Sequence, residues 1–390
     1  MISVNDALDQ LFGLVTPLRA ETVPLDQAAG RVMIRAAHAM RDQPPFDASA
    51  MDGYAVRAAD VTPGARFTVI GESAAGHGFN RALQPNECVR IFTGAPVPEG
   101  ADRIIIQEDV TRHKTQITLK DDLDTGPYIR AKGSDFAEGA MIDAPRRLRA
   151  SDIALLASMN VAQVTCTRKP RIALMSTGDE LVLPGEAPGP DQIIASNTYG
   201  LKAMLDAAGA EARILPIARD NAPSLTAAFE LAQDSDMIVT IGGASVGDHD
   251  LVADVAQTMG LRQAFYKIRM RPGKPLMAGK MGDVPMVGLP GNPVSALVCG
   301  QVFLLPMLQV MLGFPGAPAP RLRAPLALDI PKNGPREHYM RAVVDGDTIT
   351  PADRQDSSLL TVLATSNALM IRPPDDGPRK AGEMMDYLPL

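Results

Sequence analysis

The stretch from residue 169 to residue 259 alternates between strand-like and helix-like segments, and this alternation constrains the fold most. Strands are expected at 171–176, 212–217 and 237–241, and helices at 198–208, 224–233 and 251–259. The alternation predicts a doubly wound α/β domain, with a parallel sheet covered by helices on both faces. In such sheets ligands bind beyond the carboxyl ends of the strands. We therefore expect a binding edge formed by the loops 177–180, 220–221 and 242–250.

The rest of the chain predicts further modules, which makes the fold class multi-domain α/β. Short alternating runs rich in flanking glycine and proline indicate a β-rich module between residues 41 and 132. The proline-rich stretch 315–320 is typical of a linker, and residues 321–390 are expected to be β-rich, with a hairpin signal at Asp345-Gly346. Amphipathic helices are expected at 3–16, with Ser3 and Asp6 in a capping box, and at 151–160, with Ser151 as the cap.

Composition excludes several classes of protein. The chain has 390 residues, of which 46% are apolar and 21% charged, as in soluble globular proteins. A net charge of −7 and the lack of tryptophan argue against general nucleic-acid binding. The three widely spaced cysteines have no metal-type spacing, so buried thiols in a reducing, cytoplasmic compartment are expected. No signal peptide is indicated, and the apolar stretch 294–314 is interpreted as a buried core helix ended or kinked near Pro306 rather than a membrane span.

The segment 237–250 carries the strongest local signal for a ligand. An apolar strand runs into Gly242-Gly243, followed by Ser245 and by the acid Asp248. Paired glycines let backbone N–H groups approach an anion, and a nearby carboxylate can bind Mg²⁺ together with phosphate oxygens. The pattern matches neither the P-loop nor the dinucleotide fingerprint. An ordinary strand-to-helix turn is the alternative.

Two loops beyond other strands have a similar character. Ser176, Thr177 and Gly178 end a strand and are followed by Glu180, which could face a metal across the crevice. A capped helix start with acids near its positive end is the alternative. Pro290, Asn292 and Pro293 follow another apolar strand and could present backbone groups to a ligand, or could simply form a tight turn.

A basic segment and three acidic or hydroxylic turns complete the set of candidates. Lys267, Arg269 and Arg271 are spaced by two, so an extended chain would place them on one face, and Lys274 follows a Pro-Gly turn. This cluster is typical of an anion site, although a charged edge strand is the alternative. The turns are 49–56, with Asp52, the segment 92–96, with Thr93, and 132–135, with Asp135; each singly is more typical of a structural turn.

Taken together, these segments resemble the molybdopterin molybdenumtransferase family, which includes the E domain of gephyrin. The matching segments occur in the family's order and span nearly the whole chain: 49–56 (SAMDGYAV), 92–94 (FTG), 133–135 (GSD), 176–180 (STGDE), 242–248 (GGASVGD), 272–275 (PGKP) and 289–295 (LPGNPVS).

The resemblance implies an elongated four-part subunit and a homodimer, with an active site where the α/β domain of one subunit meets the β-rich domain of its partner. It implies an N-terminal helix at 1–12, a connecting region at 13–37 and 137–162, and a β-rich domain at 38–136. The molybdopterin-binding α/β domain would cover 163–317, and a β-barrel-like domain 318–390. The implied reaction inserts molybdenum from molybdate into adenylylated molybdopterin and releases AMP, with Mg²⁺ required.

The resemblance also implies roles for the candidates. Gly242, Gly243 and Ser245 would hold nucleotide phosphates, assisted by Ser176, Thr177, Gly178, Pro290, Asn292 and Pro293, and Glu180 and Asp248 would hold Mg²⁺. Lys267, Arg271 and Lys274 would neutralise phosphates or molybdate, with Arg341 and Ser357 as further anion contacts. Asp52, Thr93 and Asp135 would act at the metal-receiving end, and Asp220 would orient a water or hydroxyl.

Two positions depart from the family pattern. Arg271 stands where lysine is common, which keeps the charge but changes the geometry, and Ala244 is smaller than usual. The alternatives are a molybdopterin adenylyltransferase, a nucleotide enzyme sharing only the α/β domain, and a non-catalytic scaffold. The acids Asp52 and Asp135 in a separate domain favour the insertion step. A molybdopterin adenylyltransferase and recipient molybdoenzymes are the expected partners, without nucleic acid or membrane.

Overall fold

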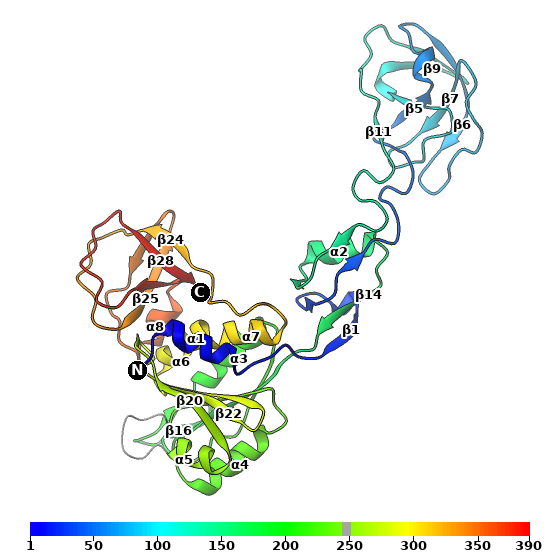
Figure 1. The fold of residues 1–390 in the computed structure, drawn as a ribbon. Helices are drawn as coiled ribbons and strands as arrows, with labels where there is room; N and C mark the ends of the chain where they lie inside the picture. The colour runs from blue at the N-terminus through cyan, green and yellow to red at the C-terminus, as the bar shows by residue number, and fades with distance from the viewer. Residues whose placement is uncertain (244–250) are drawn as a thin grey trace. The chain divides into compact units, whose positions relative to one another are not determined.

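The computed structural model describes residues 1–243 and 251–390, which form two compact units. One unit comprises Met1–Glu21 and Thr167–Leu390, and the other comprises Thr22–Cys166. The first contains the α/β sheet and a C-terminal β sheet, whereas the second is β-rich (Figure 1). The multi-domain α/β fold class predicted from the sequence is therefore confirmed.

The central sheet of the first unit is mixed rather than fully parallel. Its strand order is β18 (Glu211–Ile214), β15 (Arg171–Ser176), β19 (Met237–Ile241), β23 (Val284–Leu289), β22 (Pro275–Met281) and β20 (Leu261–Lys267). The three predicted strands β18, β15 and β19 run parallel, as expected, and β23 joins them in the same direction, whereas β22 and β20, which lie beyond the predicted alternation, run antiparallel. The correction has a local cause: Gly282-Asp283 alone connect β22 to β23, and a two-residue turn can join only antiparallel strands.

Helices cover both faces of this sheet, as the alternating pattern predicts. On one face, α4 (Ala222–Ala232) and α5 (Leu251–Thr258) bury Phe229 and Val252 against Ala173 and Ile238 of the sheet. The remaining helices of the domain pack elsewhere: α3 (Asn197–Ala207) contacts β15 and α6 (Pro293–Cys299), and α1 (Val4–Phe12) contacts α7 (Leu305–Met311). The carboxyl ends of the strands are thus left open for loops.

The apolar segment after β23 forms one helical stretch inside the fold. A π-helical turn at Gly300–Leu304 separates α6 from α7. It lies immediately before Pro306, whose missing N–H and bulky ring disturb the preceding turn, so the predicted irregularity near Pro306 is confirmed. The stretch Pro293–Met311 is long and apolar enough to cross a membrane, but 78% of its most apolar window is buried in the protein. This burial is that of a core helix.

The two predicted amphipathic helices form, with one change of cap. In α1, Ser3 Oγ accepts a hydrogen bond from Asp6 N, and Asp6 accepts one from Ser3 N, which confirms the capping box. In α2 (Ala150–Ser158), Ser151 lies inside the helix, so the predicted cap is wrong. The buried Asp152 carboxylate instead accepts from Arg149 N and from Arg146, so it caps the helix from its first turn.

The C-terminal residues form a second sheet that also includes a short strand from the α/β region. Its order is β21 (Met270–Arg271), β25 (Glu337–Asp345), β27 (Ala368–Arg372), β28 (Met384–Pro389) and β24 (Leu322–Pro325), with β26 (Thr348–Pro351) paired to β25 and a short helix α8 (Leu360–Ala364). The predicted hairpin is confirmed because Asp345 pairs with Thr348 across a two-residue turn. Strand β21 places Arg271 beside His338, so the basic segment joins the two sheets.

The second unit is built from small sheets, as its glycine and proline content predicts. The main sheet has the order β8 (Arg103–Ile106), β5 (Gly53–Val56), β7 (Glu87–Ile91), β6 (Arg66–Ser73), β10 (Gln116–Leu119) and β9 (Val110–His113). The smaller ladders are β11 (Ile129–Arg130) with β4 (Ala48–Ser49), β12 (Met141–Ile142) with β3 (Ala37–His38), and β1 (Ala20–Pro24), β14 (Gln163–Thr167), β2 (Val32–Met33) and β13 (Arg146–Arg147). β4 ends at Ser49 and β5 begins at Gly53, so Asp52 lies in the short connection between these two strands.

Candidate functional site

A cavity of about 590 Å³ opens at the carboxyl ends of β15, β19 and β23. Seven residues proposed from the sequence line it: Ser176, Thr177, Glu180, Gly242, Pro290, Asn292 and Pro293. They come from three loops that are far apart in the chain but adjacent in the sheet. The structure therefore brings together the loops that the strand alternation places at one edge.

The Thr177 hydroxyl and the paired glycines form a tight floor beside this cavity. A Cβ at Gly242 would lie 2.7 Å from Thr177 O, and one at Gly243 would lie 3.0 Å from Thr177 Oγ1. Both glycines also have positive φ, at 94° and 68°. Thr177 Oγ1 is buried and has no hydrogen-bond partner among the described residues. Only glycine fits here, and the hydroxyl keeps a hydrogen-bonding capacity that a bound ligand could use.

Arg219 fixes the loop that carries Glu180. Its Nη1 donates to the carbonyl oxygens of Gly178, Asp179 and Leu181 at 3.1–3.3 Å. The neighbouring Asp220 is exposed and donates its backbone N–H to Asp179 Oδ1 at 3.1 Å. The proposed residues Gly178 and Asp220 therefore belong to one hydrogen-bonded loop pair at the binding edge, although neither lines the cavity itself.

The loop that follows β23 connects the cavity to the C-terminal domain. Asn292 Nδ2 donates to Ser357 Oγ at 3.0 Å, and Val294 N donates to Ser357 O at 3.1 Å. On the other side, Asn197 Nδ2 donates to Gly291 O at 2.7 Å, which ties the start of α3 to the same loop. Ser357 thus lies at the border of the cavity, where Ser358 is also part of the lining.

Buried and exposed residues alternate along the basic segment, as expected, but its cations lie near two different cavities. Ile268 and Met270 are buried, whereas Arg269 and Arg271 are exposed. Lys267 pairs in register with Pro275, which lines the cavity directly after Lys274. Arg271 instead lines a separate cavity of about 350 Å³ in the C-terminal domain, together with His338 and Arg372. The three predicted cations therefore do not converge on one point of the nucleotide-side cavity.

Arg341 is fully buried although its guanidinium is incompletely paired. The side chain has no exposed surface, and Nη2 donates to Asp356 O at 2.9 Å. Nε and Nη1 have no hydrogen-bond partner within the described parts of the chain. Burial, and then the nearby charge of Arg271, lowers the pKa of Arg341. Burial of such a guanidinium costs free energy unless an anion accepts its remaining hydrogen bonds. Arg341 also lies close to the cavity in the chain of contacts, because Asp356 is followed by Ser357, which bonds to the cavity residue Asn292.

In the second unit, Asp52 and Thr93 form one hydrogen-bonded pair. Asp52 Oδ1 accepts from Thr93 N at 2.7 Å and from Thr93 Oγ1 at 2.8 Å. These bonds, and then the charge of Arg90, lower the pKa of the Asp52 carboxyl, so Asp52 is ionised at neutral pH. Asp135 lies toward the other end of the β4–β11 ladder, where its N–H donates to Gln43 O at 2.9 Å. No hydrogen bond between described residues joins Asp135 to Asp52.

The two residues Ser245 and Asp248 lie outside the described residues, so Glu180 is the described member of the predicted metal pair. Among the residues that are described, no group of three or more His, Cys, Asp or Glu side chains could hold a metal. Mg²⁺ often binds proteins through one or two carboxylates, with substrate phosphates and water supplying the other oxygens. Glu180 lines the same cavity as Thr177, whose hydroxyl has no partner within residues 1–243 and 251–390, and this arrangement fits that pattern, whereas a site built from protein ligands alone does not.

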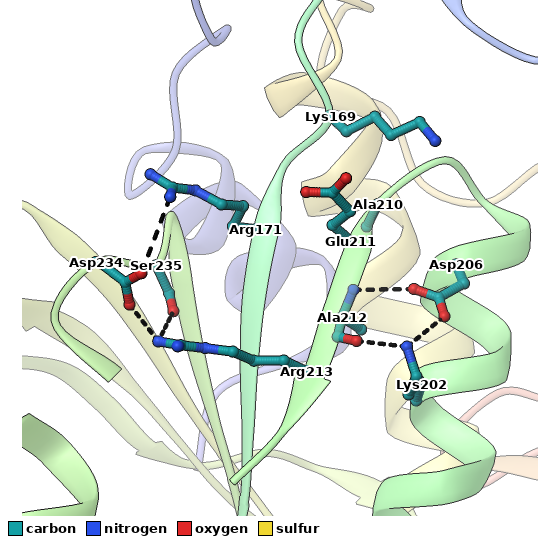
Figure 2. Close-up of a pocket in the computed structure, with 10 residues that line it drawn as sticks. All are labelled: Lys169, Arg171, Lys202, Asp206, Ala210, Glu211, Ala212, Arg213, Asp234 and Ser235. Carbon is teal, nitrogen blue, oxygen red and sulfur yellow. Dashed lines mark hydrogen bonds and ion pairs between the residues drawn. The ribbon is translucent and has the colours of Figure 1, made fainter. Parts of the chain in front are cut away.

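Another cavity, of about 570 Å³, lies at the opposite end of the sheet, before the starts of β15, β18 and β19 (Figure 2). Its charged side chains are largely paired with one another: Lys202 with Asp206 at 2.7 Å, and Arg213 with Asp234 (Figure 2). Parallel sheets bind ligands at the carboxyl ends of their strands, and this cavity is at the amino ends. Position and internal pairing therefore both favour the Thr177 cavity as the functional site.

Some residues of the site have no signal in the sequence. Asn197 and Ser358 line the cavity, and Arg219 fixes the Glu180 loop, yet none belongs to a segment proposed from the sequence. Asn197 could have been found because it begins a helix directly after a strand-like run. The others depend on contacts between segments that are far apart in the chain.

Comparisons with known proteins cover the whole chain. Family models match at residues 2–160 (MoeA N-terminal region, domain I and II), 173–310 (probable molybdopterin binding domain) and 323–390 (MoeA C-terminal region, domain IV).

Two curated relatives and one solved structure agree with these matches. A molybdopterin molybdenumtransferase from Nostoc sp. is 34% identical over 96% of this chain and 90% of its own, and one from Haemophilus influenzae is 32% identical over 100% and 99%. The crystal structure of a molybdopterin biosynthesis MoeA protein from Pyrococcus horikoshii superimposes with a TM-score of 0.85, at 30% identity over 100% of this chain and 99% of that one. The chain therefore belongs to the molybdopterin molybdenumtransferase family.

Proposed function

We propose that this protein inserts molybdenum from molybdate into the dithiolene of adenylylated molybdopterin and releases AMP. The observation that carries the proposal is the presence, in one compact unit, of two sites with incomplete hydrogen bonding. Among the described residues, the Thr177 hydroxyl has no partner beside a cavity suited to a nucleotide, and two nitrogens of the Arg341 guanidinium have none close to Ser357, which bonds to the cavity residue Asn292. One site suits the phosphates of the pterin nucleotide, and the other suits a small oxyanion.

The nucleotide end of the substrate would lie against the loops at the carboxyl ends of the strands. The hydroxyls of Ser176 and Thr177 and the N–H of Gly243 would donate hydrogen bonds to phosphate oxygens, and Ser245 would extend this set. Gly178 and Gly242, whose N–H groups donate to Ala218 O and Leu289 O, would let the backbone approach the phosphates closely. Pro290, Asn292 and Pro293 would shape the opposite wall. The support is that these loops line or border one cavity and that the unpaired hydroxyl lies beside it.

Mg²⁺ would be held by Glu180 and Asp248 together with phosphate oxygens. When bound, the ion would neutralise charge on the phosphates that bridge AMP to the pterin. Arg219 has a supporting role, because its three hydrogen bonds to the loop carbonyls hold Glu180 in place. Asp220, in the neighbouring loop, would orient a water or a ligand hydroxyl.

The molybdate substrate would bind at Arg341 and Ser357, with Lys267, Arg271 and Lys274 adding positive charge. Nε and Nη1 of Arg341 point to different sides of the guanidinium, so a bound oxyanion would accept from one of these two donors, which lack partners among the described residues. Burial, and then the charge of Arg271, lowers the pKa of Arg341, so Arg271 adds positive potential in this region. Arg271 is also the position where lysine is common in the family.

Asp52, Thr93 and Asp135 would act at the metal-receiving end of the pterin. Because the Thr93 hydrogen bonds keep Asp52 ionised, it would accept a proton or a hydrogen bond rather than donate one. Asp52 and the Arg341 region lie in different compact units. We propose a cytoplasmic homodimer in which the β-rich domain of one subunit completes the α/β site of the other.

The domain bounds that accompany this proposal are 1–12 for the N-terminal helix, 13–37 and 137–162 for the connecting region, and 38–136 for the β-rich domain. The α/β domain would span 163–317, and the C-terminal domain 318–390. A molybdopterin adenylyltransferase would supply the substrate, and molybdoenzymes would receive the product. The family matches at 2–160, 173–310 and 323–390 support this division.

Turnover by purified protein tests the proposal. Adenylylated molybdopterin, Mg²⁺ and molybdate would be supplied, and AMP would be measured over time for wild type, Glu180→Gln and Glu230→Gln. Glu180 lines the cavity, whereas the exposed Glu230 lies on α4 and serves as the matched control. We expect molybdate-dependent AMP release that falls at least about 100-fold in Glu180→Gln and stays at the wild-type rate in Glu230→Gln. Equal activity of all three proteins, or AMP release that ignores molybdate, would refute the proposal.

A further inference from the structure

In the β-rich unit, Arg90 contacts both flanks of the Asp52–Thr93 pair. Arg90 lies on β7, and its guanidinium carbon lies 5.1 Å from the ring centre of Tyr54 and 4.8 Å from that of Phe92. Phe92 directly precedes Thr93, and Tyr54 follows Asp52 by two positions. The guanidinium is thus stacked between rings from the two chain segments that carry the pair.

The hydrogen bonds of Arg90 reach the same two segments and a third. Nη1 donates to Gly53 O at 3.0 Å, and Nη2 donates to Gln107 Oε1 at 2.8 Å. Gln107 in turn donates its backbone N–H to Asp52 O at 3.1 Å. Arg90, Gly53, Asp52 and Gln107 therefore form a closed ring of covalent and hydrogen bonds around the backbone of Asp52.

The backbone at this point leaves little room for adjustment. A Cβ at Gly53 would lie 2.0 Å from Ile105 O, so the chain after Asp52 is pressed against β8. Contacts at Gly53 on one side and at Phe92 on the other therefore restrain the segments that carry the Asp52 carboxylate and the Thr93 hydroxyl. A guanidinium suits this task better than an ammonium, because it is planar, stacks on rings and donates in two fixed directions.

We propose that Arg90 is a positioning residue for molybdenum insertion, which clamps the Asp52–Thr93 pair in its working geometry without touching substrate. The inference rests on the proposed function of Asp52 and Thr93. The Thr93 hydrogen bonds, and to a smaller extent the charge of Arg90, hold the pKa of Asp52 below its usual value. Loss of Arg90 should therefore change both the placement and the ionisation of Asp52.

The test compares Arg90→Met, Arg90→Lys and the control Arg66→Met in the full-length protein. Arg66 is an exposed arginine on β6 of the same sheet and has no place in the clamp. For Arg90→Met we expect kcat to fall about ten- to a hundredfold while KM for adenylylated molybdopterin stays within about twofold, because misplacement affects the chemical step. The acid limb of the pH–rate profile should move to higher pH in Arg90→Met. In Arg90→Lys it should lie closer to the wild-type profile, because lysine keeps the positive charge although it lacks the planar guanidinium.

A second measurement separates this inference from the proposed function and from misfolding. The backbone amides of Thr93 and Gln107 donate to Asp52. In Arg90→Met, hydrogen exchange at these two amides should increase, whereas exchange elsewhere in the sheet should stay at wild-type rates. Phe92→Leu, which removes one stacked ring and keeps both arginine hydrogen bonds, should give a smaller change in the same direction. If wild type shows no insertion, local exchange still tests the clamp. Unchanged kcat with unchanged exchange, or a kcat loss explained wholly by a lower folded fraction, would overturn the inference.

Discussion

Replacing the buried Arg341 with methionine should stabilise the protein while removing its affinity for the oxyanion. Two buried guanidinium nitrogens, Nε and Nη1, have no partner in the part of the chain that the structure describes, and each unpaired buried donor costs about 1–3 kcal/mol. The variant gives up the Nη2 hydrogen bond to Asp356 O, which as a charged bond is worth about 1.5–3 kcal/mol. The difference is a net gain of about 1–3 kcal/mol in the unfolding free energy. Buried ionic groups replaced by apolar residues of similar volume show gains of this order, about 1–4 kcal/mol.

The assay is denaturant unfolding with and without molybdate, followed through the unit that contains β25. Saturating molybdate, at about 100 times its Kd, should stabilise wild type by about 2.7 kcal/mol and leave Arg341→Met unchanged. Arg323→Met is the matched control, since Arg323 lies on β24 of the same sheet with 63% of its side chain exposed, and we expect a change within about 0.5 kcal/mol. The reasoning is refuted if Arg341→Met destabilises the ligand-free protein by more than about 2 kcal/mol, or if molybdate stabilises variant and wild type equally.

Two further predictions concern the dimer and the response to pH. Mixing Asp52→Asn and Glu180→Gln subunits in equal amounts should restore about a quarter of wild-type turnover, because half of the dimers would carry one intact site; no recovery would place both residues in sites built from one subunit. Burial, and then the charge of Arg271, lowers the pKa of His338 from 6.5 to about 3. Between these two pH values the unfolded chain binds a proton that the folded chain does not. The unfolding free energy therefore falls by about 1.4 kcal/mol per pH unit as pH falls from 6.5 toward 3. His338→Gln should therefore lose about 2 kcal/mol less than wild type between pH 6.5 and 5, whereas the exposed His113→Gln should follow wild type; parallel losses in all three would contradict a neutral buried His338.

The sequence predicts the parts of the site that depend on the order of strands and loops. Ser176, Thr177 and Gly242 follow strands of one sheet, so their convergence at the carboxyl edge follows from alternation and sheet chirality. Strand direction at the far side of the sheet is not contained in periodicity, because β22 and β20 have the same apolar character whichever way they run. Local competition between caps is equally hidden, as the choice of Asp152 over Ser151 in α2 shows.

The residues that sequence reasoning missed act across long separations in the chain. Arg219 bonds to carbonyls about forty positions away, and Arg90 reaches Gly53 at a separation of 37 residues. The complete burial of Arg341 is another such case, because a single arginine in a strand is ordinarily expected to be exposed. These contacts depend on how separate strands and loops pack, which no local pattern encodes. The structure therefore adds two kinds of knowledge: which polar atoms these long-range contacts pair, and which buried polar atoms remain without a partner among the described residues.

The most direct measurement is a single-turnover count of both products. Enzyme in excess over adenylylated molybdopterin would receive Mg²⁺ and molybdate, and AMP released and molybdenum retained on the pterin would be quantified in the same sample. We expect one molybdenum retained for each AMP released, and no AMP release above background when molybdate is omitted. AMP release without retained molybdenum, or tight binding with neither product, would contradict the assignment of this chain as a molybdenum insertase.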